Sequence, residues 1–580
     1  MTISTVLIAN RGEIAVRIAR VARDLGIKSI AIYSEADAGA LHTQVADEAY
    51  AIPGNSAADT YMNVPAILDI ASRAGADAIH PGYGFLSENS EFARTVTAAG
   101  MIWIGPDPEA IDLLGDKIAA RRVATEVGAP LAPGTSDPIA DWQQAHSFAE
   151  EHGLPIAIKA AYGGGGRGLK VVDNMDDIEG AFNSAGREAM EAFGRAECYV
   201  EKFLTHPRHV EAQVLADTHG NVVVLGTRDC STQRRFQKLI EEAPAPGLTD
   251  KQRNGIIEGA RSICQKVGYT GAGTVEYIVS EDGTISFLEV NTRVQVEHPI
   301  TEVVTGVDII AEQFRIAAGE TLSITEDPQS QGHAFEFRIN AEDILNGFAP
   351  CPGTVTAFEA PTGPGIRVDS AVRSGSIIPP YYDSLMAKLI VSGPTREIAL
   401  NRARQALKEF TITGVRTVLP FHRDMLENPA LTGEGLDTAI GVYTDWVDHN
   451  YRPSAAHQVE SVEAIYAERR NFIIELDGKL VNVGLPVEAF GAFAGGGQAG
   501  ASNDSAGAAG AGDVTAPYDS NLVDWNVADG DTVEENQPIA TVEAMKAESS
   551  IKAPAAGTIS LVAEAGSRLS SGQVIARISS

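Results

Sequence analysis

The first part of the chain alternates short apolar runs with a helical pattern of apolar positions. Val6–Ala9 and Ser29–Tyr33 are apolar enough to predict two buried strands. Between them, apolar residues recur at helical spacing up to Gly26, which marks the end of the helix. The order strand, helix, strand predicts a βαβ unit and therefore a parallel sheet. The turn reads Asn10-Arg11-Gly12-Glu13 and lacks the G-x-G-x-x-G pattern of dinucleotide-binding folds.

Beyond residue 115 the pattern changes from regular alternation to a mixture of strands and helices. An apolar run at 101–104 predicts one more strand of the first part, and later runs predict strands at 334–340, 353–358 and 366–372 and a helix at 395–410. Two further apolar runs flank Asp477-Gly478, which predicts a hairpin. We therefore expect a multidomain α/β and α+β chain. Its expected parts are 1–115, 116–330, 331–446 and a small β-containing docking or spacer module at 452–490.

The last part of the chain is separated from the rest and repeats itself. Residues 491–513 are rich in alanine and glycine and are typical of a flexible linker. In the tail, 514–580, the pattern of Gly530–Val542 recurs as Gly566–Ile578. Such a repeat predicts two interlocked halves related by a pseudo-twofold axis. A tight turn at the junction would expose Lys546 at a hairpin tip.

Two polar motifs in the middle of the chain suggest chemistry. A predicted strand, Ile156–Lys159, leads into a glycine-rich loop at 160–168. Glycines let backbone amides approach phosphate oxygens, although a flexible hairpin tip has the same composition. From 289 to 297, polar and apolar residues alternate, and an extended chain would place the polar ones on one face. These polar residues are Glu289, Asn291, Arg293, Gln295 and Glu297.

The residue types of this polar segment favour a particular reaction site over a solvated edge strand. Together with Glu276, its carboxylate and amide oxygens are hard ligands that suit Mg²⁺ bound to ATP. Arg293 suits a small anion, and Glu297 suits a general base.

Composition narrows the possible partners. The 580 residues have a formal net charge of −32, which disfavours nucleic acid and anionic lipid as partners. No apolar run approaches the roughly 18 residues of a membrane span, and the apolar stretch near the N-terminus is too short for a signal peptide. We therefore expect a cytoplasmic protein with no membrane contact. The four cysteines form no C-x-x-C pair, so we expect reduced structural thiols.

The motifs together resemble a known family. Residues 3–445 are similar to a biotin carboxylase of the ATP-grasp class. The resemblance rests on the segments Ile8–Ala15, His80–Asn89, Gly115–Lys117, Arg208–Glu211, Arg228–Ser231, Glu241–Pro246, Glu289–Pro299, Arg338–Glu342 and Pro380–Ser384. The tail resembles the biotinyl domain of biotin-dependent carboxylases, a small all-β flattened barrel, which we call the carrier domain. Ala544-Met545-Lys546 matches its biotin-attachment motif, with Ala547 where many members have methionine.

This resemblance implies a role for each matching residue. The implied nucleotide contacts are Lys117, Lys159, Gly165, Gly166 and His209, with a hinge at the adenine formed by Glu201, Lys202 and Leu204. The implied metal ligands are Glu276, Glu289 and Asn291, and the implied bicarbonate pocket is Lys238, Arg293, Gln295 and Val296. Glu297 is the implied base, Arg338 stabilises the biotin enolate, and Lys546 is the attachment site for biotin. Phe236 stands where some members have a histidine that contacts the nucleotide.

The resemblance also implies an activity and partners. The expected reaction carboxylates carrier-bound biotin with bicarbonate through carboxyphosphate, using ATP and Mg²⁺ or Mn²⁺. The length between 445 and 514 is too short for a carboxyltransferase. We therefore expect a hetero-oligomer with a separate carboxyltransferase beta subunit acting on acetyl-CoA or propionyl-CoA in fatty-acid synthesis. A biotin protein ligase would attach the biotin.

Two alternatives are weighed against this interpretation. Another ATP-grasp ligase, such as a carboxylate–amine ligase, would not need Lys546 or the repeat. A non-catalytic biotin carrier or scaffold would not need the set Lys238, Arg293 and Glu297.

Overall fold

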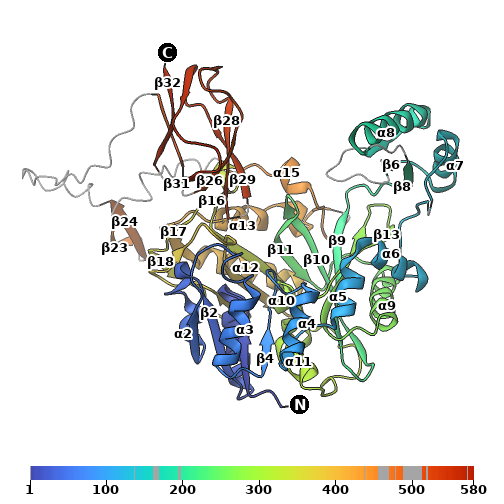
Figure 1. Ribbon diagram of the computed structural model, residues 1–580, viewed down its shortest axis with the longest axis horizontal. Helices are drawn as coiled ribbons and strands as arrows, with labels where there is room; N and C mark the ends of the chain where they lie inside the picture. Colours follow the sequence, from blue (N-terminus) through green and yellow to red (C-terminus); the bar gives the residue numbers. More distant parts are fainter. Residues whose placement is uncertain are drawn as a thin grey trace, which may run out of the picture.

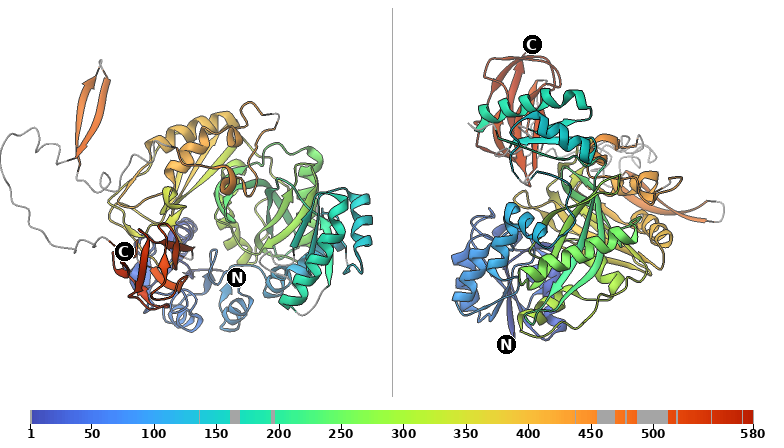
Figure 2. Two further views of the ribbon diagram at one scale, coloured as in Figure 1. Left: turned by 90° about the horizontal axis from the view of Figure 1, so that it is seen from above. Right: turned by 90° about the vertical axis from the view of Figure 1, so that its right-hand side faces the viewer.

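The computed structural model shows a large body and a small β-rich domain at the end of the chain (Figure 1). It describes residues 2–135, 137–160, 169–193, 197–436, 438–454, 469–476, 479–486, 512–517, 520–545, 547–570 and 572–579. The N-terminus and the C-terminus lie at opposite ends of the molecule (Figure 2, right). Among the helices described, none has the length and apolar character needed to cross a bilayer.

The N-terminal domain is built on the predicted strand–helix–strand unit. The strands β1 (Thr5–Ile8) and β2 (Lys28–Tyr33) pair in parallel, and α1 (Gly12–Asp24) connects them. The sheet continues in parallel with β3 (Glu48–Ala51), β4 (Ala78–His80) and β5 (Ile102–Trp103), in the order β3-β2-β1-β4-β5. The apolar face of α1 is buried against this sheet, which confirms the prediction from spacing. The other helices here are α2 (Leu41–Val45), α3 (Val64–Arg73), α4 (Ser90–Ala98) and α5 (Pro108–Gly115).

A small subdomain stands apart from the rest of the body, at the right of Figure 1. Its antiparallel sheet has the order β7-β6-β8, and α7 and α8 pack on it. The bounds are β6 (Ile156–Ala160), β7 (Leu169–Val172), β8 (Cys198–Lys202), α7 (Trp142–His152) and α8 (Ile178–Phe193), preceded by α6 (Lys117–Glu126). The glycine-rich loop at 161–168, between β6 and β7, lies outside the described residues.

One antiparallel sheet forms the centre of the body. Its eight strands run in the order β13-β12-β9-β10-β11-β14-β21-β19. They are β9 (Arg208–Ala216), β10 (Val222–Arg234), β11 (Gln237–Ala243), β12 (Gly271–Val279), β13 (Ile285–Asn291), β14 (His333–Asn340), β19 (Ile366–Ser370) and β21 (Leu385–Gly393). Because β11 pairs with β14, the sheet continues across residue 330, where the sequence suggests a division.

Helices pack around this sheet. The helices are α9 (Asp250–Lys266), α10 (His298–Thr305), α11 (Ile309–Ala317), α12 (Arg396–Glu409), α13 (Leu419–Leu426), α14 (Pro429–Thr432) and α15 (Trp446–Asn450). The predicted strands at 334–340 and 366–372 and the helix at 395–410 are confirmed as β14, β19 and α12.

The strand predicted at 353–358 is wrong in one respect, because it is two short strands. β17 (Gly353–Thr354) pairs with β20 (Ile377–Ile378), whereas β18 (Ala357–Glu359) pairs with β22 (Thr411–Thr413). The chain changes partners at Val355 and Thr356, whose amides donate to carbonyls of two different segments. The apolar run is therefore divided between two sheets.

The C-terminal part confirms the internal repeat. The carrier domain consists of two four-stranded sheets with matching orders, β25-β32-β30-β27 and β29-β28-β26-β31. The strands are β25 (Asp513–Thr515), β26 (Ser520–Trp525), β27 (Thr532–Val533), β28 (Pro538–Ala544), β29 (Ala547–Lys552), β30 (Gly557–Leu561), β31 (Arg568–Leu569) and β32 (Val574–Ser579). The apolar residues shared by the two repeats form its core. The predicted hairpin is also present, as β23 (Arg469–Leu476) paired with β24 (Lys479–Pro486).

The carrier domain lies against the body (Figures 1 and 2). Strand β29 contacts β16 (Ala349–Pro350), which pairs with β15 (Glu342–Asp343). Ala349 of β16 packs into the core of the carrier domain, and Met545 of the carrier packs into the core of the body domain at 331–446.

Candidate active site

A cleft of about 1610 Å³ lies where the N-terminal domain, the central sheet and the carrier domain meet. Most of the residues expected to act in catalysis line it. They are Lys117, His209, Lys238, Glu276, Glu289, Asn291, Arg293, Gln295, Val296, Glu297 and Arg338. The cleft is also lined by Met545, the neighbour of Lys546 in the sequence.

The residues of the expected adenine hinge, and the expected nucleotide contact Lys159, lie in the small subdomain and not along this cleft. Lys159 on β6 forms an ion pair with Glu201 on the adjacent strand β8. Lys202 donates to the Leu154 carbonyl at 2.9 Å, and Leu204 follows the end of β8. These residues belong to the small subdomain and are not among those lining the cleft. Gly165, Gly166 and Lys546 lie outside the described residues.

The polar segment 289–297 is not one extended strand, contrary to the expectation from its alternation. β13 ends at Asn291, and α10 begins at His298 with Glu297 as its N-cap. Glu88 accepts from the Thr292 amide at 3.1 Å and from Arg293 Nε at 3.0 Å, so the chain after β13 is bound by a residue of the N-terminal domain. Proline in the first turn of α10 favours the start of that helix. The five polar side chains therefore do not share one face.

Lys238 lies among three buried carboxylates, and we call this set the Lys238 cluster. Its Nζ is 2.7 Å from Glu211, 3.1 Å from Glu276 and 2.6 Å from Glu297. Burial acts to lower the pKa of Lys238, but the surrounding acidic groups hold it well above its usual range. The ammonium therefore stays charged and offsets the repulsion between the carboxylates.

Glu297 joins the Lys238 cluster to Arg338. One oxygen accepts from Lys238, and the other accepts from an Arg338 nitrogen at 2.9 Å. Burial acts to raise the pKa of Glu297, but Lys238 and Arg338 hold it well below its usual range. The carboxylate is therefore ionised and has the proton-accepting form that a general base needs. Arg338 is itself oriented by Glu241, which accepts from its Nε at 2.5 Å.

The expected metal ligands are brought together by strand pairing. Glu276 on β12 lies directly opposite Glu289 on β13, and Asn291 follows two residues later on the same strand. Glu289 forms an ion pair with Lys117 at 3.2 Å. The pairing places two carboxylates and an amide at one edge of the cleft, and these hard oxygen donors fit Mg²⁺.

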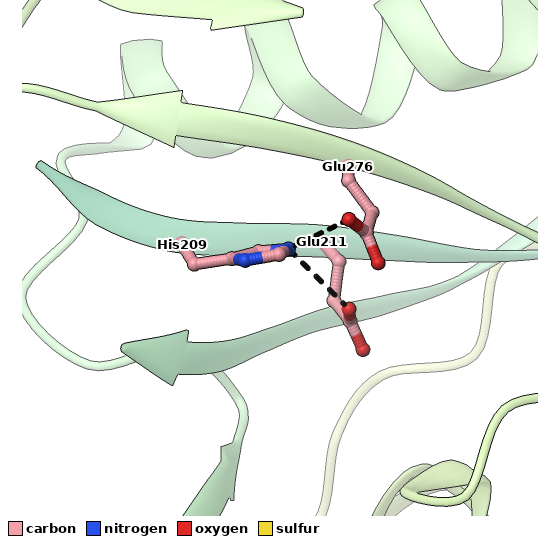
Figure 3. Close-up of side chains that lie close together, drawn as sticks. All are labelled: His209, Glu211 and Glu276. Carbon is pink, nitrogen blue, oxygen red and sulfur yellow. Dashed lines mark ion pairs between the residues drawn. The ribbon is translucent and has the colours of Figure 1, made fainter. Parts of the chain in front are cut away.

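Figure 3 shows a second arrangement of acidic groups around Glu276. His209 Nε2 lies 2.9 Å from a Glu276 oxygen, and His209, Glu211 and Glu276 offer ligand atoms within 4.8 Å of one another. Lys238 Nζ forms ion pairs with Glu211 and with Glu276. The lysine therefore supplies the positive charge that balances these two carboxylates.

Several residues that support the site received no role in the sequence analysis. Arg228 is fully buried and donates to Glu211, to Gln295 at 2.9 Å and to Thr301 at 2.8 Å. Lys388, also fully buried, donates to the Val296 carbonyl at 2.8 Å. Strand register places Arg228 on β10 directly opposite Glu211 on β9, and both residues stand in segments that carry the resemblance.

Phe236 lies on the turn between β10 and β11, at the mouth of the cleft. Its side chain is 93% exposed, and its φ of 65° is in the left-handed region. It is one of the residues that line the cleft.

Four family models match the chain in consecutive segments. They are "Biotin carboxylase, N-terminal domain" at residues 2–111, "Carbamoyl-phosphate synthase L chain, ATP binding domain" at 116–325, "Biotin carboxylase C-terminal domain" at 336–441 and "Biotin-requiring enzyme" at 510–578. A biotin-dependent acyl-coenzyme A carboxylase alpha3 subunit from Mycobacterium leprae is 50% identical over 99% of this chain and 98% of its own length. This chain belongs to the biotin-dependent acyl-CoA carboxylase alpha subunits.

Other relatives of this alpha subunit match the body. A biotin carboxylase from Nostoc is 48% identical over 76% of this chain and 99% of its own length. The crystal structure of a biotin carboxylase subunit of pyruvate carboxylase has a TM-score of 0.72 and 44% identity, covering 77% of this chain and 98% of its own. The biotin carboxylase domain of the Hydrogenobacter thermophilus 2-oxoglutarate carboxylase, crystallised with MgADP and bicarbonate, has a TM-score of 0.66, 44% identity and the same coverage.

The alpha subunit thus combines an ATP-dependent biotin carboxylase with a biotinyl carrier domain in one chain. The expected fold class is confirmed, with an ATP-grasp body of mixed α/β structure and a small all-β domain.

Proposed function

We propose that the cleft activates bicarbonate by phosphorylation and carboxylates the biotin of the carrier domain. The observation that supports this most is the position of Glu297, which contacts Lys238 at 2.6 Å and Arg338 at 2.9 Å. A bicarbonate beside Lys238 and Arg293 has its negative charge neutralised. It also draws Lys238 away from Glu297, which raises the basicity of that carboxylate.

The step we propose for Glu297 is a proton transfer. A Glu297 oxygen accepts the bicarbonate proton while a bicarbonate oxygen attacks the γ-phosphorus of ATP. The products are carboxyphosphate and ADP, and the protein contributes charge neutralisation and positioning. Gln295 and Val296 complete the bicarbonate pocket. Biotin, once attached, supplies the ureido nitrogen that takes up the carboxyl group.

The nucleotide and its metal would be held by residues of two separate parts of the body. Glu276, Glu289 and Asn291 offer oxygen donors for Mg²⁺ or Mn²⁺ at the edge of the cleft. Lys117 and His209 are the contacts expected on the same side. Lys159, Glu201, Lys202 and Leu204 belong to the small subdomain, and with Gly165 and Gly166 they would reach the nucleotide when that subdomain closes over the cleft.

The expected partners follow from the alpha-subunit family to which the chain belongs. We infer that a separate carboxyltransferase beta subunit takes the carboxyl group to acetyl-CoA or propionyl-CoA for fatty-acid synthesis, in a hetero-oligomer. A biotin protein ligase would attach biotin to Lys546. The hairpin of β23 and β24 belongs to the segment that we expect to dock this subunit or to act as a spacer.

The test is a comparison of substrate requirements in the purified full chain. We expect ADP formation to need both bicarbonate and biotin, and the carrier to give a streptavidin signal. ADP formation that proceeds equally without bicarbonate, or that requires an amine instead, would contradict the proposal. With the co-purified beta subunit, a panel of acyl-CoA substrates identifies the acceptor.

A further inference from the structure

The carrier domain contacts the body at one short segment beside the cleft. The Met545 amide donates to the Pro380 carbonyl at 3.2 Å. The Met545 side chain is 6% exposed and packs in the apolar core of the body. Its φ of 50° lies in the left-handed region, as is common at a tight turn. The residue before Lys546 is thus fixed at the cleft.

A second contact is made by Tyr381, which follows Pro380 in the body. The guanidinium carbon of Arg568 lies 4.7 Å from the centre of the Tyr381 ring, which is a cation–π distance. Arg568 is exposed, and it belongs to the second half of the carrier repeat. The two contacts therefore join opposite halves of the carrier to neighbouring residues of the body.

The internal repeat creates a problem of orientation for docking. The carrier sheets have matching strand orders, and β27 in one is the counterpart of β31 in the other. Their inward residues, Val533 and Leu569, are both buried, at 1% and 0% exposure. Their outward residues differ, because Thr532 occupies the position that Arg568 has in the second half. An apolar contact alone would distinguish the two halves poorly.

We propose that Arg568 is an orientation key that docks the carrier domain on Tyr381 by its second half. The long cationic side chain reaches the aromatic ring, whereas the threonine at the equivalent place can offer neither charge nor reach. Docking in this orientation places Met545, and hence the following lysine, at the cleft. This inference rests on the proposed function, since it concerns delivery of biotin to that site.

The experiment uses the full-length, biotinylated chain and two substrates. Single-turnover transfer of labelled bicarbonate carbon to the attached biotin reports docking. Carboxylation of added free biotin reports the cleft without docking. We expect Arg568→Ala to slow the first reaction by about 2–5-fold, the range of an exposed cation–π contact. The second reaction should be unchanged, because Arg568 lies on the carrier.

Matched variants separate orientation from general effects. Thr532→Ala, at the equivalent position of the other half, should leave both reactions unchanged. Arg568→Lys should keep part of the rate. Adding Tyr381→Ala to Arg568→Ala should cost no more for the attached biotin than Tyr381→Ala alone, because the two residues act as one contact. Exchanging the residues, as Thr532→Arg with Arg568→Thr, should not restore the rate.

The outcomes that overturn the proposal differ from those that overturn the proposed function. An unchanged rate for attached biotin in Arg568→Ala, an equal loss for both substrates, or full recovery by the exchange would exclude an orientation key. Absence of free-biotin carboxylation in the unaltered chain would instead contradict the proposed function.

Discussion

Glu241 lies directly opposite Glu336 on the paired strands β11 and β14, and both carboxylates are fully buried. Glu241 accepts from Arg338, while among the described residues the Glu336 oxygens have no hydrogen-bond partner. Burial raises the pKa of Glu241 to about 7, and it raises the pKa of Glu336 well above its usual range. Lys388 and Arg338 act in the opposite direction on Glu336. The pair therefore retains a proton near neutral pH.

This pair predicts an unusual dependence of stability on pH. A carboxyl whose pKa is raised in the folded protein binds protons there that the unfolded chain has released, so stability falls as pH rises above about 4.5. Glu336→Gln removes one of the two carboxylates. We compare the melting temperature of the variant with that of the unaltered chain at each pH. We expect this difference, variant minus unaltered chain, to be about 2–4 °C higher at pH 8 than at pH 5.

Thermal melts at both pH values check this expectation. The exposed Glu359→Gln is a control for the loss of one negative charge. Parallel pH curves for Glu336→Gln and the unaltered chain would show that the pair does not retain a proton.

Replacing Lys238 tests the charge balance of the Lys238 cluster. Lys238→Met leaves Glu211, Glu276 and Glu297 without their shared cation. Removing one partner of a buried ion pair lowers the free energy of unfolding by about 3–5 kcal/mol. The lowered pKa values of Glu276 and Glu297 stabilise the fold at pH above about 4.5, and this contribution is lost as pH falls. The deficit of the variant should therefore be largest at pH 7 and smaller at pH 4.

Urea unfolding at the two pH values measures this deficit. Lys251→Met, at an exposed position, provides the control for a lost lysine. A deficit that is the same at both pH values would mean that lost packing, and not lost charge, causes it.

The two glutamates of the polar segment should behave differently when their charge is removed. Glu297→Gln should bind Mg²⁺–ATP nearly normally but lose bicarbonate-dependent ATP hydrolysis and biotin carboxylation together, by about 10²–10⁴-fold. Glu289→Gln should raise the Mg²⁺ requirement, and added Mg²⁺ should partly restore its activity. A Mg²⁺ titration of both variants measures the difference. Recovery of Glu297→Gln by Mg²⁺ would identify both carboxylates as metal ligands.

Biotin attachment should depend on one lysine of the carrier domain. Lys546→Ala should abolish the streptavidin signal of the full chain, because Lys546 stands in the attachment motif at the junction of the two repeats. The variant should still carboxylate free biotin, since the cleft is unaltered. The exposed Lys552→Ala, on the neighbouring strand β29, is the matched control. A signal that persists in Lys546→Ala would place the attachment elsewhere.

Helical spacing and internal repetition predicted the elements that they describe. The helical spacing of Ile14 and Ile18 identified α1, and the repeat identified the two halves of the carrier domain. The polar segment was different, because its course depends on Glu88, which is 204 residues away from Thr292 in the sequence. Alternation alone cannot report such a contact.

The residues of the site were predicted from the resemblance to a family more than from residue spacing or residue chemistry. The partners of Lys238 are 27, 38 and 59 residues away in the sequence, on other strands and in a turn, so spacing could not have assembled them. The fully buried Arg228 had no signal beyond its place in a quoted motif. The roles of Glu289, Glu297 and Lys546 stay predictions that the variants above test.

The unbroken central sheet has a consequence for how this chain can be recombined. Glu297 and Arg338 form one ion pair, yet they belong to segments on either side of residue 330, and β11 and β14 pair across the same point. A chimera that joins residues up to 330 from one relative to the remainder from another would have to rebuild a strand pairing and an ion pair at once. The segments on either side of residue 330 should therefore be exchanged together, whereas the carrier domain, joined by its predicted linker, can be exchanged by itself.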